Sequence, residues 1–225
     1  MPYRKTIFAP NETYHTLNRG VARQPIFFHT QHYARMLKLI DYYRFANTPT
    51  SFSQLMTVNV ETRQEILDRI KKENKLHVEI LAFCLMPNHF HLLLKQISEK
   101  GVVNFMANFQ NGYVKYLNTR ENRVGPLFQS AFKAKRIETD DQLIHVSRYI
   151  HLNPSTGYLV KIENLTEYPW SSLSLYLNRR AINNSFIKKD IIMGFFKEGI
   201  DYRKFIFDQA RYQRELAEIK HLTLE

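Results

Sequence analysis

The spacing of apolar residues predicts a strand followed by helices over the first third of the chain. Residues 13–17 have the pattern of a strand, and residues 30–45 carry apolar side chains at helical spacing. The stretch 50–74 is polar and mixed, and we expect a short helix within it at 63–72. A loop is expected directly after the first strand, at residues 18–23.

Two further strands are predicted in close succession. Residues 77–86 form an apolar run that is typical of a buried strand, and Pro87 and Asn88 give a turn signal directly after it. Residues 89–95 have the pattern of another strand, so the two segments are expected to pair as a hairpin.

The pattern then predicts a helix at 102–119, a strand at 128–137 and a helix at 139–152. Thr139 is placed to cap the last helix, which has acidic residues in its first turn. Pro154 is expected to end this helix, because proline lacks the backbone N–H that the helix would use.

The order strand, helix, strand, strand, helix, strand, helix indicates an α+β fold. It matches a ferredoxin-like antiparallel sheet with helices packed on one face, plus an added helix. We expect residues 1–175 to form this domain and residues 176–225 to form a helical, partly basic C-terminal extension.

The charge of the chain indicates the kind of partner. The 225 residues include 32 Lys and Arg against 21 Asp and Glu, which gives a formal net charge of +11. Such a surplus suits a polyanion, because each neutralised phosphate releases counterions. The charge alone leaves open a soluble basic protein with no such partner.

The setting is predicted from one cysteine and from the lack of long apolar runs. Cys84 lies in an apolar segment, so we expect a buried, inert thiol and no internal disulfide. The N-terminal segment has no signal-peptide core, and no apolar run approaches the ~20 residues needed to cross a bilayer. A cytoplasmic protein without membrane contact is the expectation.

Two histidines on one predicted strand give a candidate metal site. His89 and His91 alternate with Phe90, so both imidazoles point to one face of the strand. Two imidazoles on one face can bind a divalent metal. Taken alone, this motif favours two ordinary histidines on a half-exposed strand, because short motifs discriminate weakly.

The last predicted helix carries a candidate nucleophile. Tyr149 and Asn153 are four residues apart and can share one helix face. The asparagine carbonyl can bind Mg²⁺ or Mn²⁺, and the tyrosine can attack a phosphate beside such an ion. Taken alone, the segment favours a core aromatic residue and a helix-end cap. His15, His145 and His151 can be catalytic too, but histidines in core segments are usually structural.

Several blocks in one order, however, resemble a known family. The chain resembles the HUH single-tyrosine transposases, an IS200-like superfamily, and among them the REP-associated tyrosine transposases. The resemblance spans roughly residues 14–176, and it rests on the blocks at 14–15, 19–20, 26–27, 85–93, 116–118, 125–129, 148–154 and 168–172.

The resemblance implies a role for four residues. It implies that His89 and His91 bind the metal, that Asn153 completes the metal site, and that Tyr149 is the nucleophile. The implied fold is the ferredoxin-like sheet with the added helix.

The residues expected to contact DNA are basic. Lys133 and Lys135 share one strand face, where they are expected to contact phosphates together, while Arg136 lies on the other face and acts separately. The arginines that flank the loop at 18–23 are expected to reach unpaired bases. The full set is Arg19, Arg23, Lys133, Lys135, Arg136 and Arg148.

These residues together predict a metal-dependent single-stranded DNA endonuclease and strand transferase. It is expected to act at hairpin DNA through a 5′-phosphotyrosine intermediate, with Mg²⁺ or Mn²⁺ and without a nucleotide cofactor. A nucleoid-associated monomer or homodimer is the expected form. The alternatives are a domesticated regulator that binds hairpin or single-stranded DNA without cutting it, and a metal phosphodiesterase that uses water as its nucleophile.

Overall fold

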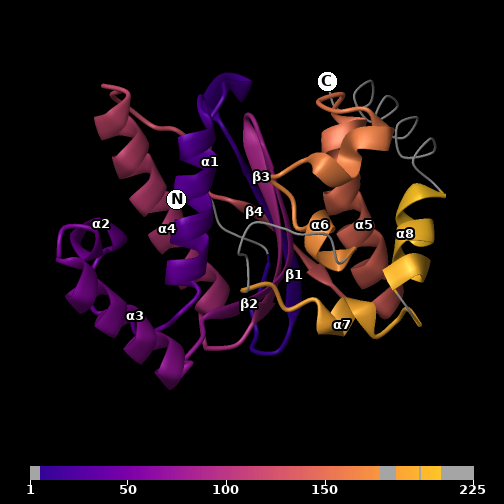
Figure 1. Ribbon diagram of the computed structural model, residues 1–225, viewed down its shortest axis with the longest axis horizontal. Coiled ribbons are helices and arrows are strands. Elements are labelled where there is room, and N and C mark those ends of the chain that lie inside the picture. The colour runs from indigo at the N-terminus through magenta and orange to yellow at the C-terminus, as the bar shows by residue number, and fades with distance from the viewer. Residues whose placement is uncertain (1–5, 178–185, 198, 209–225) are drawn as a thin grey trace.

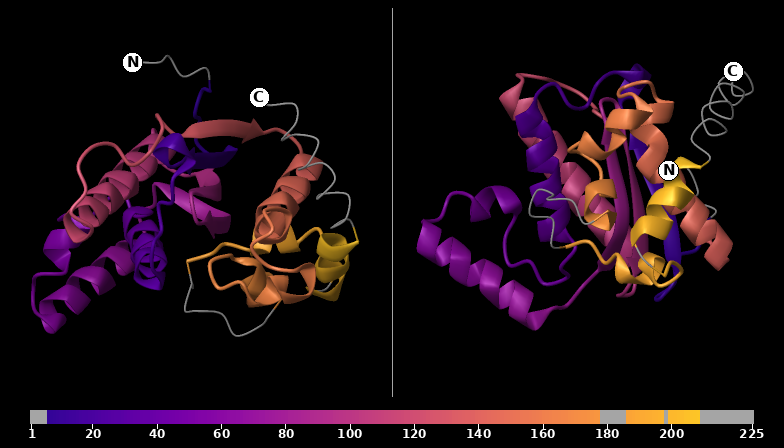
Figure 2. Two further views of the ribbon diagram at one scale, coloured as in Figure 1. Left: turned by 90° about the horizontal axis from the view of Figure 1, so that it is seen from above. Right: turned by 45° about the vertical axis from the view of Figure 1, so that its right-hand side comes forward.

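A four-stranded antiparallel sheet lies at the centre of the protein, between two layers of helices (Figure 1 and Figure 2). The computed structural model describes residues 6–177, 186–197 and 199–208. In the sheet the strands have the order β2-β3-β1-β4. Their bounds are Thr13–Arg19 for β1, Val78–Met86 for β2, His89–Gln96 for β3 and Lys133–Ile137 for β4. The predicted hairpin is β2–β3, and the α+β prediction with an antiparallel sheet is confirmed.

One face of the sheet is covered by α1 (Thr30–Tyr43) and α4 (Gly101–Arg120). Alternate residues of β3, namely Phe90, Leu92 and Leu94, belong to the large core on this side. The intervening Leu93 belongs to a second core on the other face. This alternation follows from the two-residue repeat of a strand.

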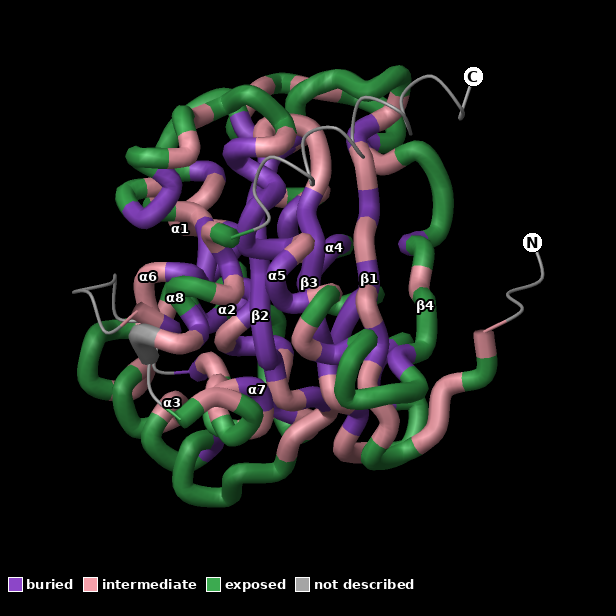
Figure 3. The backbone as a smooth tube through the Cα atoms, turned by 90° about the vertical axis from the view of Figure 1, so that its right-hand side faces the viewer, coloured by how far each residue is buried: buried purple, intermediate pink, exposed green. Residues whose placement is uncertain are grey.

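The opposite face is covered by α5 (Asp140–Thr156), which is the added helix of the predicted order. Figure 3 shows β2 and β3 buried at the centre and β4 exposed at the edge of the sheet. The other helical segments are η1 (Val21–Arg23), α2 (Phe52–Leu55), α3 (Val60–Glu73), η2 (Ile162–Glu167), α6 (Leu173–Tyr176), α7 (Asp190–Met193) and α8 (Gly199–Phe207). None of the described helices is long and apolar enough to cross a membrane.

Several predicted boundaries were wrong, and three of them bear on the sheet and α5. β1 continues to Arg19, so residues 18 and 19 lie on the strand and not in a loop. The last strand begins only at Lys133, because the side chain of Asn18 binds the backbone carbonyl of Ser130 at 3.2 Å in place of a strand partner. α5 continues past Pro154 to Thr156, since a proline in the last turn removes one hydrogen bond and Gly157 N–H still reaches the carbonyl of residue 153 at 2.8 Å.

A buried histidine joins α5 to two other segments. The ring nitrogens of His151 lie 2.8 Å from the hydroxyl of Tyr202 on α8 and 2.7 Å from Oγ of Ser172. The part of the predicted C-terminal extension that is described therefore packs against α5. Residues 178–185, 198 and 209–225 of that segment lie outside the described residues.

His151 predicts how stability depends on pH. Burial lowers its pKa to about 3, whereas an unfolded histidine titrates near ~6.5. Its contribution to the free energy of unfolding is therefore complete above about pH 6.5 and is lost as the pH falls towards 3. We expect His151→Gln to reduce the slope of stability against pH by up to about 1.4 kcal/mol per pH unit between about pH 6 and pH 4.

Urea unfolding at stepped pH values measures this slope. His29→Gln is the control, because it removes a histidine that is exposed. The same slope in wild type and His151→Gln would show that His151 does not titrate as the structure requires.

Candidate active site

Three histidines meet where β1 and β3 pair. In the antiparallel register Leu17 lies opposite His91, and Arg19 lies opposite His89. Alternate residues of both strands therefore point to the α5 side of the sheet. On that side Nε2 of His15 lies 2.9 Å from Nδ1 of His91, and the two rings stack at 5.1 Å.

Tyr149 on α5 lies against this histidine cluster. Its ring meets His91 edge-on at a centroid distance of 5.5 Å and His15 at 5.9 Å. The helix is fixed at its start by Thr139, whose hydroxyl accepts the backbone N–H of Gln142 at 3.1 Å. The tyrosine and the two histidines of β3, which the sequence placed far apart, thus lie side by side.

Asn153 follows Tyr149 one helical turn later, on the same side of α5. Its Nδ2 donates to the backbone carbonyl of Tyr149 at 2.8 Å, so the amide oxygen Oδ1 is the atom left to bind a cation. The side chain of Asn153 is only 7% exposed. The helix therefore orients both the phenol and the amide.

Burial determines the charge of the histidines. It lowers the pKa of His15 and of His89 to about 4, and it lowers the pKa of His91 well below its usual value. All three imidazoles are therefore neutral at neutral pH, which is the form that binds metals. Burial also raises the pKa of the Tyr149 phenol, while the Asn153 side chain and the charge of Arg19 oppose this increase.

The donor set fits a hard divalent cation held by few protein ligands. Among the described residues, no three His, Cys, Asp or Glu side chains are arranged to hold a metal ion. A metal at this position would rest on His89, His91 and the amide oxygen of Asn153. Such a set leaves coordination positions for water and phosphate oxygens, as is usual for Mg²⁺ at phosphate sites.

Arg19 lies at the edge of the histidine cluster. It is the last residue of β1 and pairs with His89, and its charge lowers the pKa of both His89 and His91. Its Nε is buried without a hydrogen-bond partner. This arginine is therefore part of the site, whereas Arg23 is exposed in η1, with a left-handed backbone at φ 60°.

The basic residues of β4 divide between the two faces. Lys133 and Lys135 pair with Leu17 and His15 and share the α5 side with the buried Ile137. Arg136 points to the other side, where its guanidinium binds Glu12 at 2.7 Å. Two lysines thus lie on the face that carries the histidines, and Arg136 does not.

Arg148 does not reach the surface. It is 3% exposed, its guanidinium stacks on Phe205 of α8 at 4.2 Å, and it donates to Nδ1 of His145 at 2.6 Å. The expected contact between Arg148 and DNA is therefore not available in this arrangement. α8, which the sequence did not place beside α5, covers it.

The structure also brings in residues that the sequence did not single out for this site. His15 was expected to be structural, and Asn88 was read only as a turn residue. Asn88 accepts a hydrogen bond from the ring of His89 at 2.6 Å. The alternation of residues 13, 15, 17 and 19 along β1 could have indicated His15, but only if β1 was known to pair with β3.

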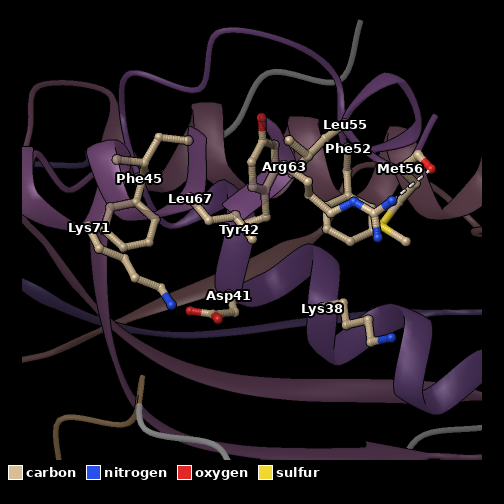
Figure 4. A pocket seen from close by; sticks show the side chains of 11 residues that line it. Lys38, Asp41, Tyr42, Phe45, Phe52, Leu55, Met56, Arg63, Leu67 and Lys71 are labelled. Carbon is tan, nitrogen blue, oxygen red and sulfur yellow. Dashed lines mark hydrogen bonds between the residues drawn. The ribbon is translucent and has the colours of Figure 1, made fainter. Parts of the chain in front are cut away.

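A separate cavity of about 280 Å³ lies on the opposite side of the sheet, between α1, α2 and α3 (Figure 4). Its lining is mostly apolar, with Tyr42, Phe45 and Phe52 among the aromatic side chains and Lys38, Arg63 and Lys71 among the basic ones. None of the predicted site residues lines it.

The fold and the site define an α+β protein with a tyrosine and paired histidines on one face of an antiparallel sheet. Residues 42–153 match the family described as "Transposase IS200 like", and the chain belongs to this family. The matched span includes His89, His91, Tyr149 and Asn153. It begins after β1, so it does not include that strand.

A solved structure, "Structure of the REP associates tyrosine transposase bound to a REP hairpin", has the same fold. It aligns with a TM-score of 0.53 and 14% identity, over 82% of this chain and 89% of that chain. At this identity the likeness shows the fold alone. No curated protein sequence matches the chain.

The burial of Arg148 predicts a structural effect of its replacement. Arg148→Ala leaves the Phe205 ring and the His145 nitrogen without their partner, so we expect the free energy of unfolding to fall by about 1–3 kcal/mol. Urea unfolding measures the change, and Arg69→Ala at an exposed position of α3 is the control. An unchanged stability would show that α8 does not hold this arginine.

Proposed function

We propose that this protein is a metal-dependent single-stranded DNA endonuclease and strand transferase that acts at hairpin DNA. The observation that carries the proposal is the position of Tyr149, edge-on to His91 at 5.5 Å with Asn153 one turn further along α5. A nucleophile beside neutral imidazoles and an amide oxygen is the arrangement that phosphoryl transfer to a tyrosine needs. Membership of a transposase family supports it.

The proposed reaction is a transesterification. The phenolic oxygen of Tyr149 attacks the scissile phosphorus, a bond forms between that oxygen and the 5′-phosphate, and the bond from phosphorus to the 3′-oxygen breaks. The 3′-oxygen leaves and takes up a proton, and the phenol has given up its own. Attack by a 3′-hydroxyl on the phosphotyrosine reverses the step, so strands can be joined without a nucleotide cofactor.

The residues of the site have separate tasks in this reaction. His89, His91 and Asn153 would hold a Mg²⁺ or Mn²⁺ ion, which supplies positive charge that polarises the phosphate. Burial raises the pKa of the Tyr149 phenol, and the charge of Arg19 favours the phenolate by opposing that rise. The same guanidinium can donate to phosphate oxygens, since its Nε has no partner in the protein.

The proposed substrate is DNA that is single-stranded at the cut and folded into a hairpin beside it. An attacking tyrosine needs in-line access to the phosphorus, which a paired duplex restricts. Lys133 and Lys135 extend the positive surface from the site along β4. The similar solved structure is bound to a REP hairpin, and this supports a hairpin as the ligand here.

The first test is covalent capture. We expect wild-type protein incubated with labelled hairpin DNA and Mn²⁺ to give a protein–DNA adduct on a denaturing gel. Tyr149→Phe should bind the same DNA and form no adduct, because the ring keeps its packing and loses the attacking oxygen.

Two controls make the result specific. Tyr158→Phe removes the hydroxyl of a tyrosine just beyond α5, and it should leave the adduct unchanged. Excess chelator should abolish the adduct with wild type. An adduct that persists with Tyr149→Phe would contradict the assignment of the nucleophile, and binding without any adduct in wild type would favour the non-cutting regulator.

The second test separates the two faces of β4. Lys135→Ala should reduce the slope of log affinity against log salt by about 0.7 if it removes one phosphate contact to a single strand, and Lys133→Ala should add a similar decrease. Arg136→Ala is the matched control, because it removes one charge from the neighbouring position on the other face. Equal slopes for Lys135→Ala and Arg136→Ala would show that the DNA does not follow the α5 side.

A further inference from the structure

We propose that Asn88 and His15 are positioning residues that fix the protonation of the two metal-binding histidines. Each holds Nδ1 of its partner, so that Nε2 of His89 and Nε2 of His91 carry the free lone pairs. The proposal rests on the proposed function for what the Nε2 atoms bind. The tautomer of His89 follows from hydrogen bonds within the protein alone, and that of His91 follows from its hydrogen bond to His15 together with the need for a free Nε2.

The tautomer of His89 follows from the orientation of the Asn88 amide. Nδ2 of Asn88 donates to the carbonyl of Arg23 at 3.0 Å, which directs Oδ1 of the same amide to the other side. That oxygen lies 2.6 Å from Nδ1 of His89. An amide oxygen only accepts, so Nδ1 of the neutral ring must carry the proton and Nε2 the lone pair.

For His91, the group that contacts Nδ1 is a second imidazole, that of His15. Nδ1 of His91 lies 2.9 Å from Nε2 of His15, a distance at which one of the two nitrogens donates a proton and the other accepts it. One proton lies between the two nitrogens. If His15 donated it, His91 would carry its own proton on Nε2 and could not bind a metal there. With His91 as the donor, both histidines of β3 have the same tautomer.

The backbone around Asn88 is held as firmly as its side chain. Gly20 N–H donates to the carbonyl of Asn88 at 2.8 Å, and Ile26 N–H donates to the carbonyl of Pro87 at 2.8 Å. A side chain at Gly20 is excluded, because a Cβ there would lie 2.2 Å from the carbonyl oxygen of Gln24. The loop after β1, in which residue 22 has a left-handed backbone conformation, therefore holds the β2–β3 turn that carries Asn88 in place by hydrogen bonds.

Partners of this kind alter how strongly a site binds its metal. Second-shell groups that fix ring orientation and tautomer typically change metal affinity by about 10–100-fold when they are removed. His15 and Asn88 each contact Nδ1 of one ring, which leaves Nε2 of that ring to bind the metal. Their loss should weaken metal binding without removing a ligand.

The first measurement needs no variant. Long-range proton–nitrogen NMR spectra of the imidazoles in the metal-free wild-type protein distinguish protonated from unprotonated ring nitrogens. We expect His89 and His91 to be protonated at Nδ1 and His15 to be unprotonated at Nε2. A proton on Nε2 of His91 would overturn the proposal, and this result does not depend on whether the protein cuts DNA.

The second measurement is the affinity for Mn²⁺ by isothermal titration calorimetry. His15→Leu should bind Mn²⁺ about 10–100-fold more weakly than wild type. His15→Gln should bind close to wild type, since its amide oxygen can accept the same hydrogen bond. His77→Leu is the control, because His77 is a half-buried, hydrogen-bonded histidine at the start of β2 and away from the site. Wild-type affinity in His15→Leu would refute the positioning role.

A third measurement, the response of the ring nitrogen signals to Mg²⁺, distinguishes a positioning residue from a metal ligand. Adding Mg²⁺, which is diamagnetic, should shift the nitrogen signals of His89 and His91 at Nε2 and leave Nε2 of His15 with its hydrogen-bonded shift. A coordination shift at His15 would make it a ligand and would overturn the proposal. Correct tautomers and metal binding without a DNA adduct would leave the proposal standing and refute the proposed function.

Discussion

The pairing of β1 with β3 is the constraint on which the site depends. It places His15 beside His91 and Arg19 beside His89, and it makes β1 a central strand of the sheet. A shift of β1 by one residue in this register would turn His15 and Arg19 to the α1–α4 side, away from His89 and His91, because side chains alternate along a strand. The core on that side, with Phe90 at its centre, holds the register in place.

Burial of this cluster gives the site its electrostatic character. Three imidazoles are kept neutral by desolvation, and Arg19 remains as the charged group beside them. Its buried Nε has no protein partner, and none of the ion pairs among the described residues involves it. A positive group without a matching carboxylate is suited to an anion that arrives from outside. This charge suits the phosphate of the proposed substrate.

α5 links this face to the rest of the protein through its opposite side. Tyr149 and Asn153 point to the sheet, while Ser147 and His151 bind Tyr202 of α8. Because Ser147, His151 and Tyr202 are fully buried and hydrogen-bonded, the helix has little freedom to rotate or slide. The described part of the C-terminal segment therefore supports the position of Tyr149, although none of its described residues belongs to the histidine cluster.

The sequence by itself determined the elements, their order and the residue types that carry the chemistry. Alternation in residues 89–95 and helical spacing around Tyr149 are local properties, and the hydrophobic pattern reports them directly. The ends of elements were less certain, as Pro154 shows. Only the tertiary structure decided which distant groups meet. It placed His15 against His91 and Arg148 under α8, because strand register and helix packing are set by contacts between segments far apart in the chain.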